Sequence, residues 1–182
     1  MPKSHLVTLA SLAAILCAAA ALTYLIYAWP EGEAGSDAGK TLASSETQIF
    51  TDLEGTPFTF DAFAGKIRVV NSWASWTPFS AVELRNLEEL ASEQDKEQVI
   101  FIAVNRKESK EIAKSYLATL GSFEGLLFAI DVNDTFYASI GGYSMPETVI
   151  YDASGNIVFH KRGPATPAEV KEQIAQALSK LE

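Results

Sequence analysis

The chain has 182 residues, of which 48% are hydrophobic and 20% charged. This length suits one well-buried domain with an additional segment and is short for two domains. After residue 29 there are 13 Lys and Arg against 23 Asp and Glu, a net charge of −10, which argues against nucleic acid or anionic lipid headgroups as partners.

The first element is an uncharged apolar run, LVTLASLAAILCAAAALTYLIYAW, over residues 6–29. As a helix these residues would extend about 36 Å, enough to cross the hydrocarbon core of a bilayer. Small residues at Ala18 to Ala21 suit a cleavable signal peptide, but the run continues to Trp29, which favours an uncleaved transmembrane anchor. A lipoprotein signal fits less well because Leu16, rather than a small residue, precedes Cys17.

The charges that flank this run predict its orientation. Lys3 is the only cation before it, and Glu31, Glu33 and Asp37 follow it. Because cations favour the cytoplasmic side, we expect residues 1–5 in the cytoplasm and the rest of the chain outside, at the cell membrane. Residues 30–45, PEGEAGSDAGKTLASS, are predicted to be a flexible linker.

The only cysteine, Cys17, lies inside the apolar run. The domain predicted over residues 46–182 therefore has no thiol for an intramolecular disulfide, a cysteine-rich metal site or a cysteine nucleophile. The chain has only two histidines, His5 and His160, which also argues against a zinc site. We predict neither a metal nor a cofactor.

Strands and helices alternate in the first half of this domain. A strand pair turned at Glu54-Gly55 is expected first, then two buried strands separated by a helix. The expected strands are residues 48–52, 58–60, 67–72 and 99–104. The helix is marked by Val82, Leu84, Leu87 and Leu90.

The second half continues the pattern. A helix is expected from Ser109 to Gly121, with Ile112, Tyr116 and Leu120 at helical spacing. A buried strand over 126–130, a short helix over 134–140 and a hairpin of 148–151 with 157–160 follow.

The last helix opens with TPAE, which predicts Thr166 as its cap and Glu169 as the partner in a capping box. Its apolar residues, expected to face the core, are Val170, Ile174, Leu178 and Leu181. Strands that alternate with helices and end in a hairpin predict an α/β domain with a mixed sheet between helical layers.

The stretch NSWASWTPFS, residues 71–80, lies between a predicted strand and a predicted helix. Backbone N–H groups and the helix dipole stabilise an anion at such a place. We expect Thr77 to cap the helix, Pro78 to be its first residue, and Ser80 its third.

Two segments resemble one family. Residues 65–90, GKIRVVNSWASWTPFSAVELRNLEEL, resemble the thioredoxin-like, membrane-anchored thiol-disulfide oxidoreductases of the TlpA and ResA type, a redoxin family. Residues 144–163, SMPETVIYDASGNIVFHKRG, resemble its second signature, in which a cis-proline, here Pro146, faces the active-site loop. The resemblance extends over residues 46–182 and implies a thioredoxin-like fold with an N-terminal strand pair.

The chain departs from this family at its redox pair. The resemblance places Thr77 and Ser80 at the two cysteine positions, and Asn71 where several thioredoxins keep an acidic proton acceptor. Hydroxyls cannot form a disulfide, and their pKa values lie far above those of thiols. Peroxiredoxins carry Thr-x-x-Cys here, but Ser80 cannot form a sulfenic acid either.

The remaining expectation is a binding face. In the family an extended substrate polypeptide pairs beside the cis-proline, which requires no cysteine. The resemblance therefore implies that an extracytoplasmic polypeptide docks on a set of residues formed by Trp76, Pro78, Phe79, Met145 and Pro146. Trp73 and Trp76 could instead both pack partly in the core beneath the loop, whereas a binding face requires Trp76 and Phe79 to be exposed.

Three functions remain open. The first is a pseudo-oxidoreductase that binds or scaffolds a polypeptide. The second is an active thiol-disulfide oxidoreductase or peroxiredoxin-like enzyme, and the third is a purely structural domain. A serine nucleophile would require a nearby base, and His160, the only histidine of the domain, is expected on the surface.

Overall fold

The computed structural model describes residues 48–181. The predicted cytoplasmic terminus (1–5), membrane anchor (6–29) and linker (30–45) lie outside these residues. Within 48–181, no helix combines the length and the apolar character needed to cross a bilayer.

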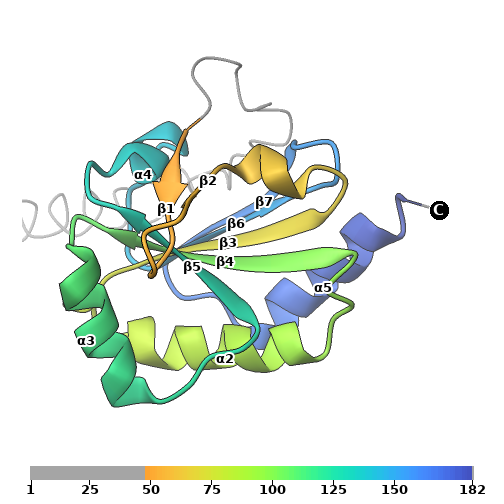
Figure 1. The fold of residues 1–182 in the computed structure, drawn as a ribbon. Coiled ribbons are helices and arrows are strands. Elements are labelled where there is room, and N and C mark those ends of the chain that lie inside the picture. Colours follow the sequence, from red (N-terminus) through yellow and green to blue (C-terminus); the bar gives the residue numbers. More distant parts are fainter. Residues whose placement is uncertain (1–47, 182) are drawn as a thin grey trace, which may run out of the picture. The chain divides into compact units, whose positions relative to one another are not determined.

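A mixed sheet forms the centre of the described domain (Figure 1). Its strands lie in the order β2-β1-β5-β4-β3-β6-β7. Their bounds are β1 Phe50–Thr51, β2 Pro57–Phe58, β3 Ile67–Trp73, β4 Val99–Arg106, β5 Leu126–Asp131, β6 Glu147–Tyr151 and β7 Ile157–Arg162. The predicted strand pair is present, but Phe60 lies in a following 3-10 turn and not in the second strand.

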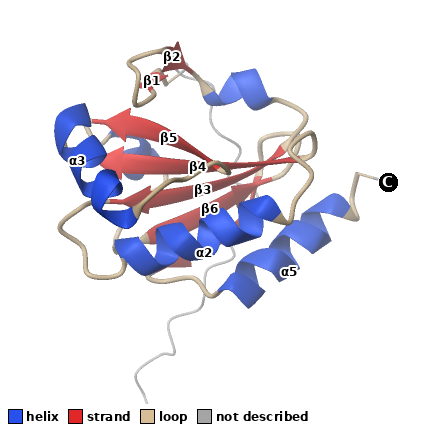
Figure 2. Cartoon of the chain, turned by 60° about the horizontal axis from the view of Figure 1, so that its bottom comes forward, coloured by secondary structure: helices blue, strands red, loops and turns tan. Residues whose placement is uncertain are grey.

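Helices cover both faces of this sheet. They are η1 Phe60–Phe63, α2 Ser80–Ser92, α3 Lys110–Leu120, α4 Thr135–Ser139 and α5 Pro167–Leu178. Helices α2 and α5 lie side by side on one face (Figure 2), and the residues of η1 and α4 pack in the core cluster of the other face. The predicted α/β architecture is confirmed.

Strand directions bring the two signature segments to one edge. Strands β3, β4 and β5 are parallel, so their carboxyl ends meet at the same edge of the sheet. Strand β6 is antiparallel to β3, with Ser72 opposite Glu147, so β6 starts where β3 ends. The loops at 74–79 and 141–146 therefore leave the sheet next to each other.

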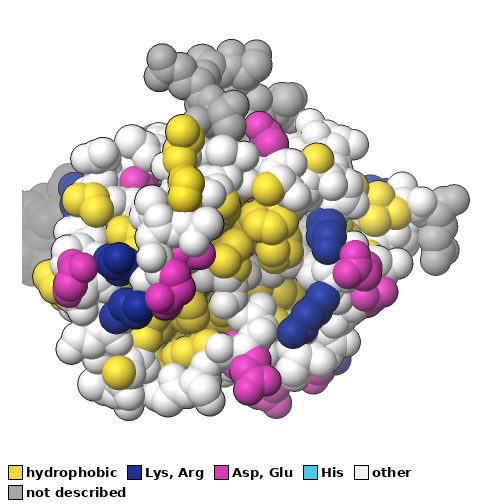
Figure 3. Space-filling model, in the orientation of Figure 1, with side chains coloured by type: hydrophobic (Ala, Val, Ile, Leu, Met, Phe, Trp, Pro, Cys, Tyr) yellow, Lys and Arg dark blue, Asp and Glu magenta, His cyan; other side chains and the backbone are white. Residues whose placement is uncertain are grey.

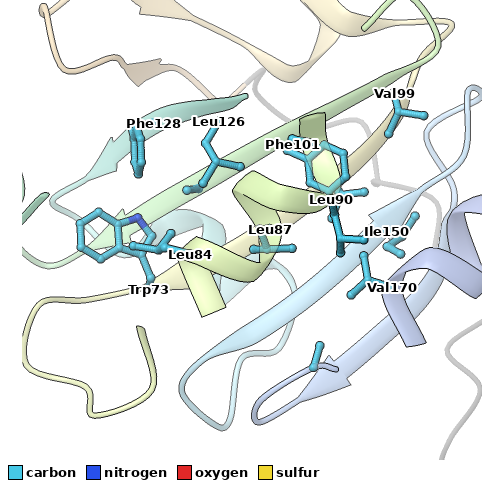
Figure 4. Close-up of a cluster of buried hydrophobic side chains, with 14 of the residues drawn as sticks. Trp73, Leu84, Leu87, Leu90, Val99, Phe101, Leu126, Phe128, Ile150 and Val170 are labelled. Carbon is cyan, nitrogen blue, oxygen red and sulfur yellow. The ribbon is translucent and has the colours of Figure 1, made fainter. Parts of the chain in front are cut away.

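The core between the sheet and α2 contains Trp73, which is fully buried (Figure 4). Its ring stacks on Tyr116 and meets the edge of Phe128. Because an aromatic side chain buries a large apolar area, this contact fixes the end of β3 under the loop that follows. The predicted core position of Trp73 is confirmed.

The helix ends follow the sequence signals in two helices. Ser109 caps α3, and Gly121 ends it at φ 97°, a backbone angle that favours glycine. Thr166 and Glu169 form the predicted capping box of α5. Leu181 was wrongly assigned to the core: α5 ends at Leu178, and Leu181 beyond it is 49% exposed.

Charged side chains of both signs alternate on the face shown in Figure 3. Ion pairs at the surface of the domain include Lys114 with Glu54 and Lys171 with Glu93. Such exposed pairs contribute little to stability.

The cap of α5 gives a direct test of how the sequence sets a helix end. Thr166 Oγ1 accepts the Glu169 N–H at 3.2 Å, and Glu169 Oε2 accepts the Thr166 N–H at 2.9 Å. We expect Thr166→Ala to lower the free energy of unfolding by about 1 kcal/mol in denaturant titrations. Thr119→Ala, at an exposed position inside α3, is the matched control and should cause no loss. Equal destabilisation by both would contradict the cap.

Candidate functional site

The loop at 74–79 connects β3 to α2, but its residues do not have the predicted helical roles. Helix α2 begins at Ser80, and its cap residue is Phe79, whose carbonyl accepts the Glu83 N–H at 3.0 Å. The predictions of Thr77 as cap, Pro78 as first residue and Ser80 as third residue are therefore wrong. The reason is that Thr77 bonds to the residue three positions before it rather than to the helix that follows. Its N–H and its Oγ1–H both donate to the Ala74 carbonyl, at 3.2 and 3.0 Å.

Thr77 and Ser80 form a closed pair. Their hydroxyls are hydrogen-bonded to each other, and Ser80 Oγ also accepts the Ala74 N–H at 3.4 Å. Both residues are buried, at 5% and 1% exposure. An alcohol needs an adjacent base to act as a nucleophile, and each hydroxyl here is instead engaged with its neighbour or with Ala74.

The loop at 141–146 leads into the start of β6, beside the end of β3. The Met145–Pro146 peptide bond is cis, as predicted. Since Ser72 lies opposite Glu147, continuing the two chains brings Ala74 towards Met145. Pro146 is itself buried and Met145 is half-buried. The structure therefore gathers all the predicted binding residues at one edge, although Pro146 contributes shape rather than exposed area.

Three aromatic side chains project at this edge. Trp76 is 60% exposed, Phe79 51% and Tyr143 86%. Trp76 and Phe79 were proposed from the sequence, whereas Tyr143 was missed because nothing in its local pattern separates it from an ordinary loop residue. We call the surface formed by Trp76, Pro78, Phe79, Tyr143 and Met145 the docking face, after the role that the sequence analysis predicted for four of these residues.

Glu83 is a buried carboxyl beneath the loop that the sequence analysis missed. It is 4% exposed, and its Oε1 accepts hydrogen bonds from Asn71 Nδ2 and Thr148 Oγ1, both at 3.0 Å. Burial raises the pKa of Glu83 to about 7, against hydrogen bonds from Thr148, the Ala165 backbone and Asn71 that lower it.

A proton-accepting group is therefore present here, on α2 rather than at Asn71. The spacing of Glu83 from Leu87 and Leu90 could have revealed its burial, because these three residues lie on the inward face of one helix.

His160 does not lie on the surface as predicted. Its side chain is 7% exposed, and Nε2 lies 2.9 Å from Glu147 Oε2. Glu147 is fully buried, and a buried carboxyl requires hydrogen-bond partners, which draws the imidazole inwards. The imidazole ring therefore contacts Glu147, and it is not the base for either hydroxyl of the Thr77–Ser80 pair. Among residues 48–181, no cluster of three or more His, Cys, Asp or Glu could hold a metal ion.

Comparison with known proteins gives consistent matches. The family model described as Redoxin matches residues 33–178. The thiol:disulfide interchange protein HelX of Rhodobacter capsulatus is 34% identical over 124 residues, which are 68% of this chain and 68% of HelX. The thiol:disulfide interchange protein DsbE of Vibrio cholerae is 29% identical over 143 residues, 79% of this chain and 74% of DsbE.

Solved structures show the same fold. A secreted Mycobacterium tuberculosis disulfide oxidoreductase superposes with a TM-score of 0.62 at 21% identity, covering 71% of this chain and 96% of that one. A thiol:disulfide interchange protein of the thioredoxin family from Chlorobium tepidum gives 0.61 at 21% identity, covering 75% and 99%. The thioredoxin-like fold expected from the sequence is confirmed.

The raised pKa of Glu83 predicts a pH-dependent stability. The folded state keeps a proton that the unfolded chain loses above pH 4.5, so this group's contribution falls between pH 4.5 and about 7 and is constant above. The fall amounts to about 3 kcal/mol. Glutamine does not titrate, so the variant Glu83→Gln escapes this loss. We therefore expect the free energy of unfolding of Glu83→Gln, measured by denaturant titration against that of the unsubstituted chain, to be more favourable to the variant at pH 8 than at pH 4. Glu89→Gln, exposed on the same helix, should show no such difference; a pH-independent effect of Glu83→Gln would contradict the burial argument.

Proposed function

The chain belongs to the Redoxin family, and from that premise we propose that its thioredoxin-like domain binds an extended extracytoplasmic polypeptide without exchanging disulfides. The observation that carries this proposal is the closed, buried Thr77–Ser80 hydroxyl pair at the place where the family resemblance puts two cysteines. A site of this shape keeps the docking geometry and lacks the reactive sulfur.

The chemistry of the pair supports the loss of redox activity. Disulfide exchange requires a thiolate that attacks a sulfur atom, and the only thiol in the 182 residues is Cys17, in the apolar run at 6–29. The Thr77 and Ser80 oxygens cannot take its place, since no oxygen–sulfur exchange regenerates a protein disulfide. Their mutual hydrogen bond further removes both groups from the surface.

The exposed aromatic side chains on the loops at 74–79 and 141–146 support binding. Exposed aromatic side chains are enriched where proteins contact partners, because they bury a large area at a small cost in conformational entropy. Trp76, Phe79 and Tyr143 lie on the two loops that meet beside the cis peptide bond at Pro146. An extended polypeptide could place side chains against these rings while its backbone runs along Met145.

The location we propose is the outer side of the cell membrane, with residues 6–29 as a single-pass anchor and residues 1–5 in the cytoplasm. The uncharged length of that run and the acidic segment after it support this arrangement. A tethered domain meets its partners within a restricted volume, which raises their effective concentration.

A second candidate is an active thiol-disulfide oxidoreductase. The names of the curated relatives favour it, as does Glu83, a buried proton acceptor of raised pKa beneath the loop. This function would require a thiol from outside the domain. A peroxidase reaction requires the same missing atom, and a purely structural role would leave the aromatic edge without a partner.

Reduction of insulin disulfides tests the loss of redox chemistry. We expect the full chain in detergent to give no turnover above the rate of dithiothreitol alone, since the domain contains no thiol. Thr77→Cys combined with Ser80→Cys should restore turnover, because the loop, the cis peptide bond and Glu83 remain in place. Clear turnover by the unsubstituted chain would contradict the proposal.

Photo-crosslinking tests the docking face. With a photoreactive residue at Phe79, we expect capture of an extracytoplasmic polypeptide in native membranes, and Trp76→Ala should reduce that capture by burying less aromatic area. The same probe at Leu181, which is 49% exposed beyond α5, is the matched control. Equal capture from both positions, or none from Phe79, would favour the purely structural role.

A further inference from the structure

We propose that Glu108 is the positioning residue of the docking face: its buried carboxylate holds the loop at 74–79 in the conformation that presents Trp76. This inference rests on the proposed function, because it concerns how the same face is kept ready for a partner. Glu108 is outside both signature segments and lies between β4 and α3.

The contacts of Glu108 converge on one loop residue. Its Oε2 accepts the Ser75 backbone N–H at 2.9 Å, and its Oε1 accepts the Ser75 hydroxyl. Oε2 also accepts Asn105 Nδ2 at 2.7 Å, which fixes the carboxylate to the end of β4. Glu108 is only 7% exposed, so these hydrogen bonds compensate for a carboxylate that has lost its water.

Ser75 is the residue directly before Trp76, which makes this contact important. The other hydrogen bonds of the loop join the Thr77 hydroxyl to the Ala74 carbonyl, the Ala74 N–H to Ser80 Oγ, and the Thr77 and Ser80 hydroxyls to each other, so they lie within the loop and its junction with α2. The Glu108 carboxylate joins Ser75 to the segment between β4 and α3. Without it, Trp76 would have to be ordered when a partner binds, at a cost in conformational entropy.

The backbone before Glu108 is also unusual. Lys107 has φ 58°, a left-handed conformation that is uncommon for residues other than glycine. Its N–H donates to the Asp131 carbonyl at 3.0 Å, which fixes this turn against the end of β5. A strained residue held by its surroundings is typical of functional positions, and here the turn is the one that leads into Glu108.

The facing loop is held in the same way. Glu147 Oε1 accepts the Tyr143 and Ser144 N–H groups at 2.6 and 2.5 Å, and its Oε2 contacts His160 at 2.9 Å. Both loops of the docking face are therefore fixed through backbone N–H groups by a buried carboxylate. This repetition on two unrelated chain segments supports a positioning role for Glu108.

Glu108→Gln in the full chain in detergent tests this role. A glutamine keeps only one acceptor oxygen and carries no charge, so the charge-assisted hydrogen bonds from Ser75 are replaced by weaker neutral ones. We expect roughly 10-fold weaker binding, equivalent to 1.4 kcal/mol, of reduced, carboxymethylated α-lactalbumin, an extended polypeptide without free thiols, measured by fluorescence anisotropy. Hydrogen exchange should accelerate in the peptide covering 74–79 and remain unchanged over 141–147.

Glu111→Gln is the matched control, because it makes the same charge change at an exposed position on α3. It should alter neither binding nor exchange. Ser75→Ala, which removes only the hydroxyl contact, should weaken binding less and tests the idea even if Glu108→Gln folds poorly. Faster exchange over 74–79 with unchanged affinity would overturn the positioning role. Binding to the unsubstituted chain that Trp76→Ala does not weaken would instead contradict the docking face itself.

Discussion

The functional edge of this domain depends on the burial of carboxyl groups that must find hydrogen-bond donors. Glu83, Glu108 and Glu147 are all less than a tenth exposed, and all lie near the point where β3 ends and β6 begins. Because a buried carboxylate without partners is costly, each one draws in whatever donors the surrounding chain offers. For Glu108 and Glu147 these donors are loop N–H groups, so the requirement to satisfy the carboxylates also fixes both loops.

Glu147 and Glu83 differ in what surrounds them. Glu147 meets His160 and two backbone N–H groups, which outweigh the effect of burial and lower its pKa. Glu83 receives only neutral donors, and burial prevails, so its pKa rises. One edge thus contains a carboxylate that stays ionised and a carboxyl group that can hold a proton near neutral pH. Only the second could exchange protons with a reacting group, and the Thr77–Ser80 pair offers it no thiol.

The sequence predicted much of the fold because the relevant signals are local. The capping box at Thr166, the glycine that ends α3 at Gly121 and the apolar strand β4 each depend on residues close together in the chain. The resemblance added the cis peptide bond at Pro146, which periodicity alone does not reveal.

One failure concerns a local turn, and the others concern contacts between residues farther apart in the chain. Threonine is a common residue at helix caps, yet the Thr77 hydroxyl is hydrogen-bonded to Ala74 and to Ser80. His160 looked like a surface residue because its neighbours Lys161 and Arg162 are charged, but its partner Glu147 lies 13 residues away. The role of Glu108 depends on Ser75, 33 residues earlier, and only the register of β3 beside β4 brings the two together.

The docking face that we propose does not require redox chemistry, because the two depend on different atoms. The fold needs Trp73 in the core and the cis peptide bond at Pro146, and neither involves sulfur. At the positions where the family resemblance places two cysteines, the hydrogen bond between Thr77 and Ser80 spans the same three-residue separation that a disulfide would close. It holds the start of α2 against the loop, and it does so in one state only, whereas a dithiol pair alternates between two. For the function that we propose, a surface fixed in one state is suited to binding, since no change of oxidation state would release a bound polypeptide.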